Sequence, residues 1–293
     1  MSTEGGATEL VCEVIGQPDL REWRPGVHES KLAPDEVRVW VVELDAGLAP
    51  GDDEETAEPG PELVLLAADE QVRAARFIRA RDRRRFVSCR AALRQILGGM
   101  LDASPGSLQF RAGGQGKPEL VPEPGRDEPS DCRHPLRFNV SHSAELALIA
   151  VCRGRELGVD IERVRPFAEA DRIVASFFST AEQAAFAMIP DEAKDRAFVR
   201  GWTRKEAVLK ALGIGLAGLA AHYETGFGTS ELTMRFTPAT PAPRVDQWQL
   251  WEAIAAAGFV AALAIHAPAP TVPPLPASRA TLGESLPNTA ASP

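Results

Sequence analysis

The chain has 293 residues, 44% of them apolar and 25% charged, with a formal net charge of −9, which is typical of a soluble globular protein. An acidic balance argues against general nucleic-acid binding, and no stretch is long and apolar enough to cross a bilayer. The N-terminus lacks the basic and apolar regions of a signal peptide, so we expect a cytoplasmic protein. The four cysteines have no CxxC spacing, which is typical of reduced thiols.

Acidic and basic residues are segregated in the first third of the chain. Residues 1–70 carry eighteen acids and four bases, whereas residues 71–94 carry nine arginines and one acid. We expect residues 1–35 to form an N-terminal extension and residues 36–130 an N-terminal lobe that contains an acidic loop at 45–62.

The arginine-rich segment leads into a predicted helix. Apolar residues recur at helical spacing over 83–100, which favours an amphipathic helix after the strand predicted at 37–44. The arginines are interpreted either as a solvated helix face or as a site for a phosphorylated small molecule or an acidic partner.

The second half begins after a Pro- and Gly-rich stretch, and we expect residues 131–266 to form a C-terminal lobe and the Pro-rich residues 267–293 to be disordered. In the strand predicted from "GVDIER", alternation places Asp160 and Glu162 on one face. Two interpretations stay open: a solvated edge strand, or a carboxylate pair that holds a hard cation such as Mg²⁺.

The segment 197–216 is predicted to be a helix that ends at Gly213. Lys205 falls near the middle of its apolar stripe, where a lysine either extends along the stripe to water or enters a polar cleft. Glu206 and Lys210 lie one turn apart on the adjoining flank, as an ordinary helix pair or as functional groups. Upstream, the two phenylalanines of "SFFSTAE" precede a capped helix and are either core residues or part of a docking patch.

Five short motifs occur in a fixed order between residues 116 and 213. They are GKP (116–118), FNVSHS (138–143), GVDIE (158–162), FFSTAE (177–182) and WTRKEAVLKALG (202–213). This series resembles the Sfp-type (surfactin-type) 4′-phosphopantetheinyl transferases. The resemblance implies two similar α/β lobes in one chain, a pseudo-dimer with coenzyme A between the lobes.

The resemblance also implies the activity and its residues. Members of the family move the phosphopantetheine arm of coenzyme A to a serine hydroxyl of an apo carrier protein, with Mg²⁺ as the metal. Asp160, Glu162 and Glu206 match the metal-binding acids, and Glu206 also matches the general base, acting directly or through a metal-bound water. Lys210 matches a contact to the pyrophosphate. Lys117, Ser141 and His142 match family positions that contact the phosphates of coenzyme A, and Lys205 matches a lysine for phosphate contact or positioning. We expect Arg73 and Arg90 to bind its 3′-phosphate end, because the arginine side chain offers a two-point contact that suits phosphate.

Two other classes compete with this interpretation. A Mg²⁺-dependent phosphatase or nuclease would also need clustered carboxylates, but it does not explain the full series of motifs. A non-catalytic module that binds carrier proteins would not need an intact, self-repelling acid cluster. We expect a monomer, because two lobes in one chain already form the cleft. The carrier, from a polyketide, peptide or fatty-acid synthase, is not specified by the sequence.

Overall fold

The computed structural model describes residues 9–15, 32, 36–46, 56–113, 116–121, 135–215, 220–228, 235–236, 248–254, 256–266 and 280–281. The centre of the predicted acidic loop, most of the N-terminal extension and most of the Pro-rich tail lie outside these residues. None of the helices in the described ranges is both long enough and apolar enough to span a bilayer.

Two four-stranded sheets form the centre of the described part of the chain. The first has the order β1 (Glu9–Ile15), β2 (Glu36–Glu43), β6 (Leu146–Arg153) and β5 (Leu136–Ser143). The second has the order β12 (Ala280–Thr281), β10 (Trp248–Ile254), β11 (Phe259–His266) and β7 (Leu157–Arg163). In each sheet the first pair is parallel and the other two pairs are antiparallel.

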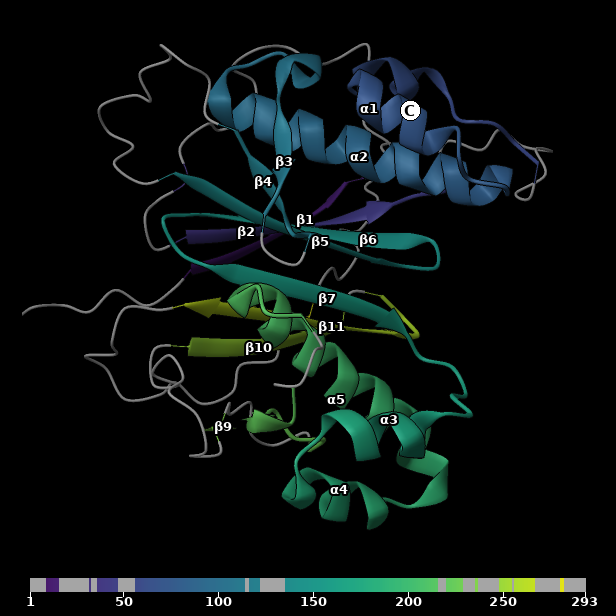
Figure 1. Cartoon of the computed structure of the whole chain (residues 1–293), viewed down its shortest axis with the longest axis vertical. Coiled ribbons are helices and arrows are strands. Elements are labelled where there is room, and N and C mark those ends of the chain that lie inside the picture. The colour runs from purple at the N-terminus through teal and green to yellow at the C-terminus, as the bar shows by residue number, and fades with distance from the viewer. Residues whose placement is uncertain are drawn as a thin grey trace, which may run out of the picture.

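Helices cover the outer faces of the two sheets (Figure 1). The two longest, α2 (Ala80–Leu101) and α5 (Asp191–Leu212), have 22 residues each, and α5 ends at Gly213 in the left-handed conformation, as predicted. The shorter elements are α1 (Ala68–Ala74), α3 (Ala170–Phe177), α4 (Thr180–Ala187), the hairpin β3 (Phe110–Ala112) with β4 (Pro118–Leu120), and the pair β8 (Tyr223–Glu224) with β9 (Arg235–Phe236). The expected two α/β lobes are present.

The hydrophobic core explains the layered order of helix, sheet, sheet and helix. Val39 of β2 and Ile161 of β7 share one buried cluster between the sheets, because alternate strand residues point inward. The other faces pack on the helices: Trp40 of β2 lies in a cluster with α2, and Ala262 of β11 lies in a cluster with α5. Burial on both faces accounts for the nearly continuous apolar run of β6.

The boundary between the sheets differs from our expectation for the C-terminal lobe. Strands β5 and β6 lie within 131–266, yet they pair with β2 in the first sheet. Two short strands, β1 and β12, fall inside the expected N-terminal extension and disordered tail. Sheet membership depends on which distant strand completes the hydrogen bonds, and the periodicity of a single strand does not carry that information.

Candidate active site

The two sheets meet along the edges of β5 and β7, where side chains take the place of a strand ladder. The backbone N–H groups of β7 donate hydrogen bonds to side-chain oxygens of every second residue of β5, and not to backbone carbonyl oxygens as in an ordinary sheet. The bonds join Asn139 Oδ1 to Val159 N (2.8 Å), Ser141 Oγ to Ile161 N (3.4 Å) and Ser143 Oγ to Arg163 N (3.2 Å). The FNVSHS motif therefore connects the two lobes directly at the GVDIE motif.

Helix α5 lies directly against β7, and a glycine makes this close approach possible. A Cβ atom added to Gly158 would lie 2.2 Å from the carbonyl oxygen of Ala207 and 2.3 Å from the backbone nitrogen of Ala211, both in α5. A side chain at this position would displace the helix backbone. Two residues further on, Asp160 lies on the same face of β7 and meets the same helix.

We expect Gly158→Ala to destabilise the protein by about 1–3 kcal/mol, the usual cost of forcing extra volume into a packed interior. Chemical denaturation measures the effect. Gly228→Ala is the matched control, because a Cβ atom there would have no neighbour within 4 Å. Equal stability of the two variants would contradict the close packing of α5 on β7.

Asp160 is the most buried acid of the predicted site. Its side chain is 5% exposed, and its Oδ1 accepts hydrogen bonds from Lys210 Nζ (2.6 Å) and Ser141 Oγ (2.7 Å). The other oxygen, Oδ2, is buried and has no hydrogen-bond partner among the described residues. Burial raises the pKa of Asp160, and the charge of Lys210 offsets only part of this rise.

Glu162 and Glu206 form an acid cluster with Asp160, whose charge acts on both glutamates. Glu162 accepts a hydrogen bond from Ser143 Oγ at 2.7 Å. Burial raises the pKa of both glutamates, and the negative charge of Asp160 raises each of them further. Two glutamates whose pKa values are raised by the charge of a neighbouring aspartate form, with that aspartate, a site that attracts a cation. In this conformation, no three acids, histidines or cysteines of the described residues converge as metal ligands.

An open, basic cavity of about 710 Å³ borders the acid cluster. Its lining residues are Asp45, Arg81, Arg85, Ser143, Ala144, Glu145, Arg163 and Arg165. Ser143 links the two features, because it lines the cavity and also holds Glu162. Within this lining Arg85 pairs with Asp45 and Arg163 with Glu145, so the four arginines leave the opening with a net positive charge that suits a ligand with phosphate oxygens.

His142 and Arg73 lie within electrostatic range of the same cluster. The pKa of the His142 imidazole is lowered, first by partial desolvation and then by nearby positive charges. These charges belong to Lys210, Arg73 and Arg85, whereas the charge of Asp160 acts in the opposite direction. The structure therefore brings the predicted residues Asp160, Glu162, Glu206, Lys210, Ser141, His142 and Arg73 into one region.

Two predicted phosphate contacts have other partners. Arg90 forms an ion pair with Glu70 of α1 and lies over the Phe110 ring. Lys117 donates to the Leu157 carbonyl oxygen at 3.0 Å and pairs with Glu156 at 3.2 Å, at the beginning of β7.

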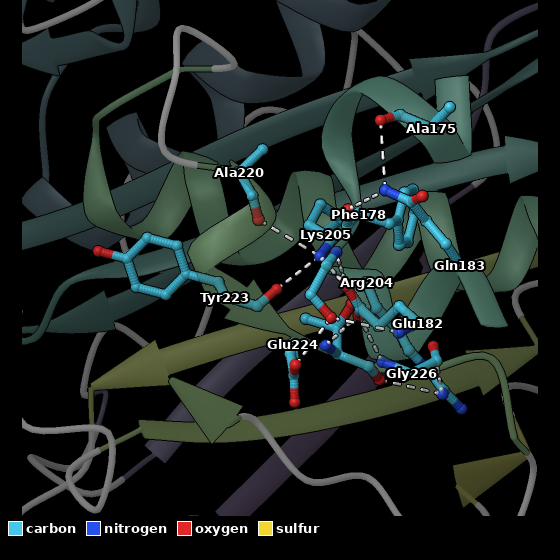
Figure 2. A network of polar contacts seen from close by, with 12 residues as sticks. Ala175, Phe178, Glu182, Gln183, Arg204, Lys205, Ala220, Tyr223, Glu224 and Gly226 are labelled. Atoms are coloured by element: carbon cyan, nitrogen blue, oxygen red, sulfur yellow. Dashed lines mark hydrogen bonds and ion pairs between the residues drawn. The ribbon is translucent and has the colours of Figure 1, made fainter. Parts of the chain in front are cut away.

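Lys205 lies inside the C-terminal lobe, in neither of the two environments that its position in the helix suggests. Its side chain is 0% exposed, and Nζ donates to Glu182 Oε2 (2.8 Å) and to the carbonyl oxygens of Ala220 (3.3 Å) and Tyr223 (2.5 Å) (Figure 2). All three N–H donors of the ammonium group are therefore used within the protein. From this position Lys205 has no donor available for a bound phosphate and fixes the segment that follows α5.

Glu182 is the centre of that network. It forms a capping box with Ser179 at the start of α4, and its Oε1 accepts from the backbone N–H groups of Thr225 (2.7 Å) and Gly226 (3.0 Å). The neighbouring phenylalanines contribute to the core: Phe178 is 1% exposed and stacks on Phe227, and Phe177 contacts Trp202. The core interpretation of this segment is the one that the packing favours.

The arginines around the cavity were not singled out by sequence reasoning. Arg81 and Arg85 belong to the basic run at 71–94, and Arg163 and Arg165 directly follow the GVDIE acids. The charge run predicted a basic helix start, but it did not indicate which arginines face the site. That choice depends on how α2 packs on the first sheet.

The sequence is similar to those of known proteins. The sequence model described as the 4′-phosphopantetheinyl transferase superfamily matches residues 156–263, and the model described as 4′-phosphopantetheinyl transferase, N-terminal, matches residues 61–153. The chain is 36% identical to the 4′-phosphopantetheinyl transferase HetI of Nostoc sp. over 252 residues, which cover 83% of this chain and 93% of the relative. It is 36% identical to the 4′-phosphopantetheinyl transferase AcpT of Escherichia coli over 101 residues (34% and 47%) and 29% identical to the 4′-phosphopantetheinyl transferase psf-1 of Bacillus pumilus over 184 residues (62% and 73%).

Proposed function

Because the chain belongs to the 4′-phosphopantetheinyl transferase superfamily and transfers 4′-phosphopantetheine to carrier proteins, we propose that coenzyme A is the donor and a carrier serine the acceptor. The serine oxygen attacks the phosphorus next to the pantetheine arm and forms a new P–O bond. The P–O bond to the nucleotide half breaks, the serine proton leaves, and adenosine 3′,5′-bisphosphate is released. The observation that carries this proposal is the acid cluster with Lys210 beside the basic cavity.

The donor set of the acid cluster fits Mg²⁺, a hard cation that prefers oxygen ligands. Asp160 Oδ2 is a buried oxygen without a partner among the described residues, so it is available as a ligand. Glu162, which Ser143 holds by one oxygen, and Glu206 would supply the others. When bound, the ion would stabilise the negative charge that builds up on the diphosphate.

Glu206 is the proposed general base for the serine hydroxyl. Burial, together with the charges of Asp160 and Glu162, raises its pKa, and a higher pKa makes a carboxylate a better proton acceptor. Lys210, whose side chain is 30% exposed, donates from the edge of the cluster and is proposed to hold an oxygen of the diphosphate.

The basic cavity is the proposed binding site for the nucleotide end of coenzyme A. Its arginines supply positive charge for the phosphates, and His142 and Lys117 are proposed as further phosphate contacts. Arg73 is exposed, with its guanidinium over the Phe86 ring, and is proposed to bind the 3′-phosphate, whereas Arg90 would first have to leave Glu70.

The acceptors are proposed to be carrier proteins or carrier domains of polyketide, peptide or fatty-acid synthases. A monomeric state and a cytoplasmic location stay predictions. Each of the two sheets supplies one edge strand to the site, and both sheets belong to the same chain, which supports a complete site within one chain.

Mass spectrometry of an apo carrier protein incubated with the enzyme, coenzyme A and Mg²⁺ tests the proposal. We expect the carrier mass to rise by one phosphopantetheine group and adenosine 3′,5′-bisphosphate to appear in equal amount. Release of inorganic phosphate without a carrier product would indicate a hydrolase instead. Carrier binding with no mass change would indicate a non-catalytic module.

A further inference from the structure

Two serines of β5 stand in the same relation to two acids of β7. Ser141 Oγ donates to Asp160 and accepts from the backbone N–H of Ile161, the next residue. Two residues along both strands, Ser143 Oγ donates to Glu162 and accepts from the backbone N–H of Arg163. Both O–H···O distances are 2.7 Å, the usual length of a good hydroxyl hydrogen bond.

A hydroxyl has one proton and two lone pairs, so these contacts determine its direction. The backbone N–H group occupies a lone pair on the side of β7, which leaves the proton for the carboxylate. Ser141 also accepts from Lys210 Nζ at 3.0 Å, so its proton and both lone pairs are all used. It therefore has no donor left for a phosphate of coenzyme A, the role that the family resemblance implies.

Asn139 links β5 to β7 without contacting an acid, so it shows what the link between the strands requires by itself. It occupies the preceding position of the same side-chain ladder and accepts from Val159 N at 2.8 Å. The residue before Val159 is Gly158, which offers no carboxylate. A side-chain acceptor is thus enough to link β5 to β7, and the hydroxyl protons of the two serines serve an additional purpose.

We propose that Ser141 and Ser143 are positioning residues for the metal ligands. Ser141 holds one carboxylate oxygen of Asp160 and Ser143 holds one of Glu162, so that the other oxygen of each acid is presented to a divalent cation. The inference rests on the proposed function, because it assumes that the acid cluster binds Mg²⁺. Asp160 Oδ2, buried and without a partner among the described residues, is the oxygen that this arrangement leaves available. Ser143 additionally places Glu162 at the wall of the basic cavity.

The test measures Mn²⁺ binding by electron paramagnetic resonance on the full-length protein without coenzyme A. We expect Ser141→Ala and Ser143→Ala each to weaken Mn²⁺ affinity about tenfold or more, the usual effect of removing a group that orients a metal ligand. Ser143→Thr keeps the hydroxyl and should restore most of the affinity. Asn139→Ala removes a strand link without touching an acid, so it should lower the melting temperature and change the Mn²⁺ affinity by less than twofold.

Steady-state kinetics separate positioning from contact with the donor. In the two serine-to-alanine variants we expect the KM for Mg²⁺ to rise, and the KM for coenzyme A at saturating Mg²⁺ to stay within about twofold of wild type. Wild-type Mn²⁺ affinity in Ser143→Ala, or an equal loss in Asn139→Ala, would overturn this inference alone. Wild-type protein that binds no Mn²⁺ would overturn both this inference and the proposed metal site.

Discussion

Transfer of phosphopantetheine falls about a hundredfold or more when Asp160 is replaced by asparagine, the loss expected when a main electrostatic stabiliser of a transition state is removed. Asparagine keeps the shape of the side chain and removes one negative charge from the acid cluster. Raising the Mg²⁺ concentration should recover part of the rate, because weaker metal binding is a cause of the loss. The measurement is the initial rate of carrier modification over a series of Mg²⁺ concentrations.

The same variant should keep a thermal stability equal to or above that of wild type. Burial raises the pKa of Asp160 above 3.8, so ionisation of this group costs more free energy in the folded than in the unfolded protein. The ionisation of Asp160 therefore lowers the free energy of unfolding of the wild-type protein as the pH rises from 3.8 through the raised pKa. Asp160→Asn has no such group and does not undergo this loss of stability. Lys210 loses its partner, but its side chain is 30% exposed and water can solvate it.

Asp191→Asn provides the matched control for this prediction. Asp191 begins α5, its side chain is 94% exposed, and it pairs with Lys194 at the surface. Its replacement should leave the transfer rate unchanged. A normal rate for Asp160→Asn at low Mg²⁺ would refute the assignment of Asp160 to the metal site.

Replacing Glu182 with alanine should destabilise the protein by about 4 kcal/mol, because breaking a buried ion pair leaves an uncompensated charge. Lys205 would remain fully buried with only two carbonyl oxygens as partners. The backbone N–H groups of Thr225 and Gly226 would also lose their acceptor, which adds a desolvation cost. Denaturant titration gives the free energy of unfolding.

A double-mutant cycle with Lys205→Met isolates the pair. The double variant should be less destabilised than the sum of the two single variants, because it contains no unpaired buried charge. Lys194→Met, an equivalent substitution at the surface of α5, should change stability little, because Lys194 pairs with the exposed Asp191 and a surface pair contributes little. For Lys205→Met we expect a KM for coenzyme A close to wild type. A large rise in that KM would mean that Lys205 contacts the donor after all.

Local patterns in the sequence determined the elements of the site and part of their orientation. The period of two in a strand places Asp160 and Glu162 on one face of β7, whatever surrounds it. The period of 3.6 in a helix places Glu206 and Lys210 on one flank of α5, and Gly213 ends that helix because it adopts the left-handed conformation. The order of the five motifs predicted the family.

The tertiary structure alone decided which partner each charged side chain meets. Lys205 and Glu206 are neighbours in sequence, yet about 100° of helix rotation separates them, so one enters the interior of the lobe and the other faces β7. Among the arginines of α2, Arg90 pairs with Glu70, whereas Arg85 pairs with Asp45 and lines the cavity. Ser141 holds Asp160 only because β5 and β7 are adjacent edges of two different sheets. Such contacts join residues far apart in the chain, and no local periodicity encodes them.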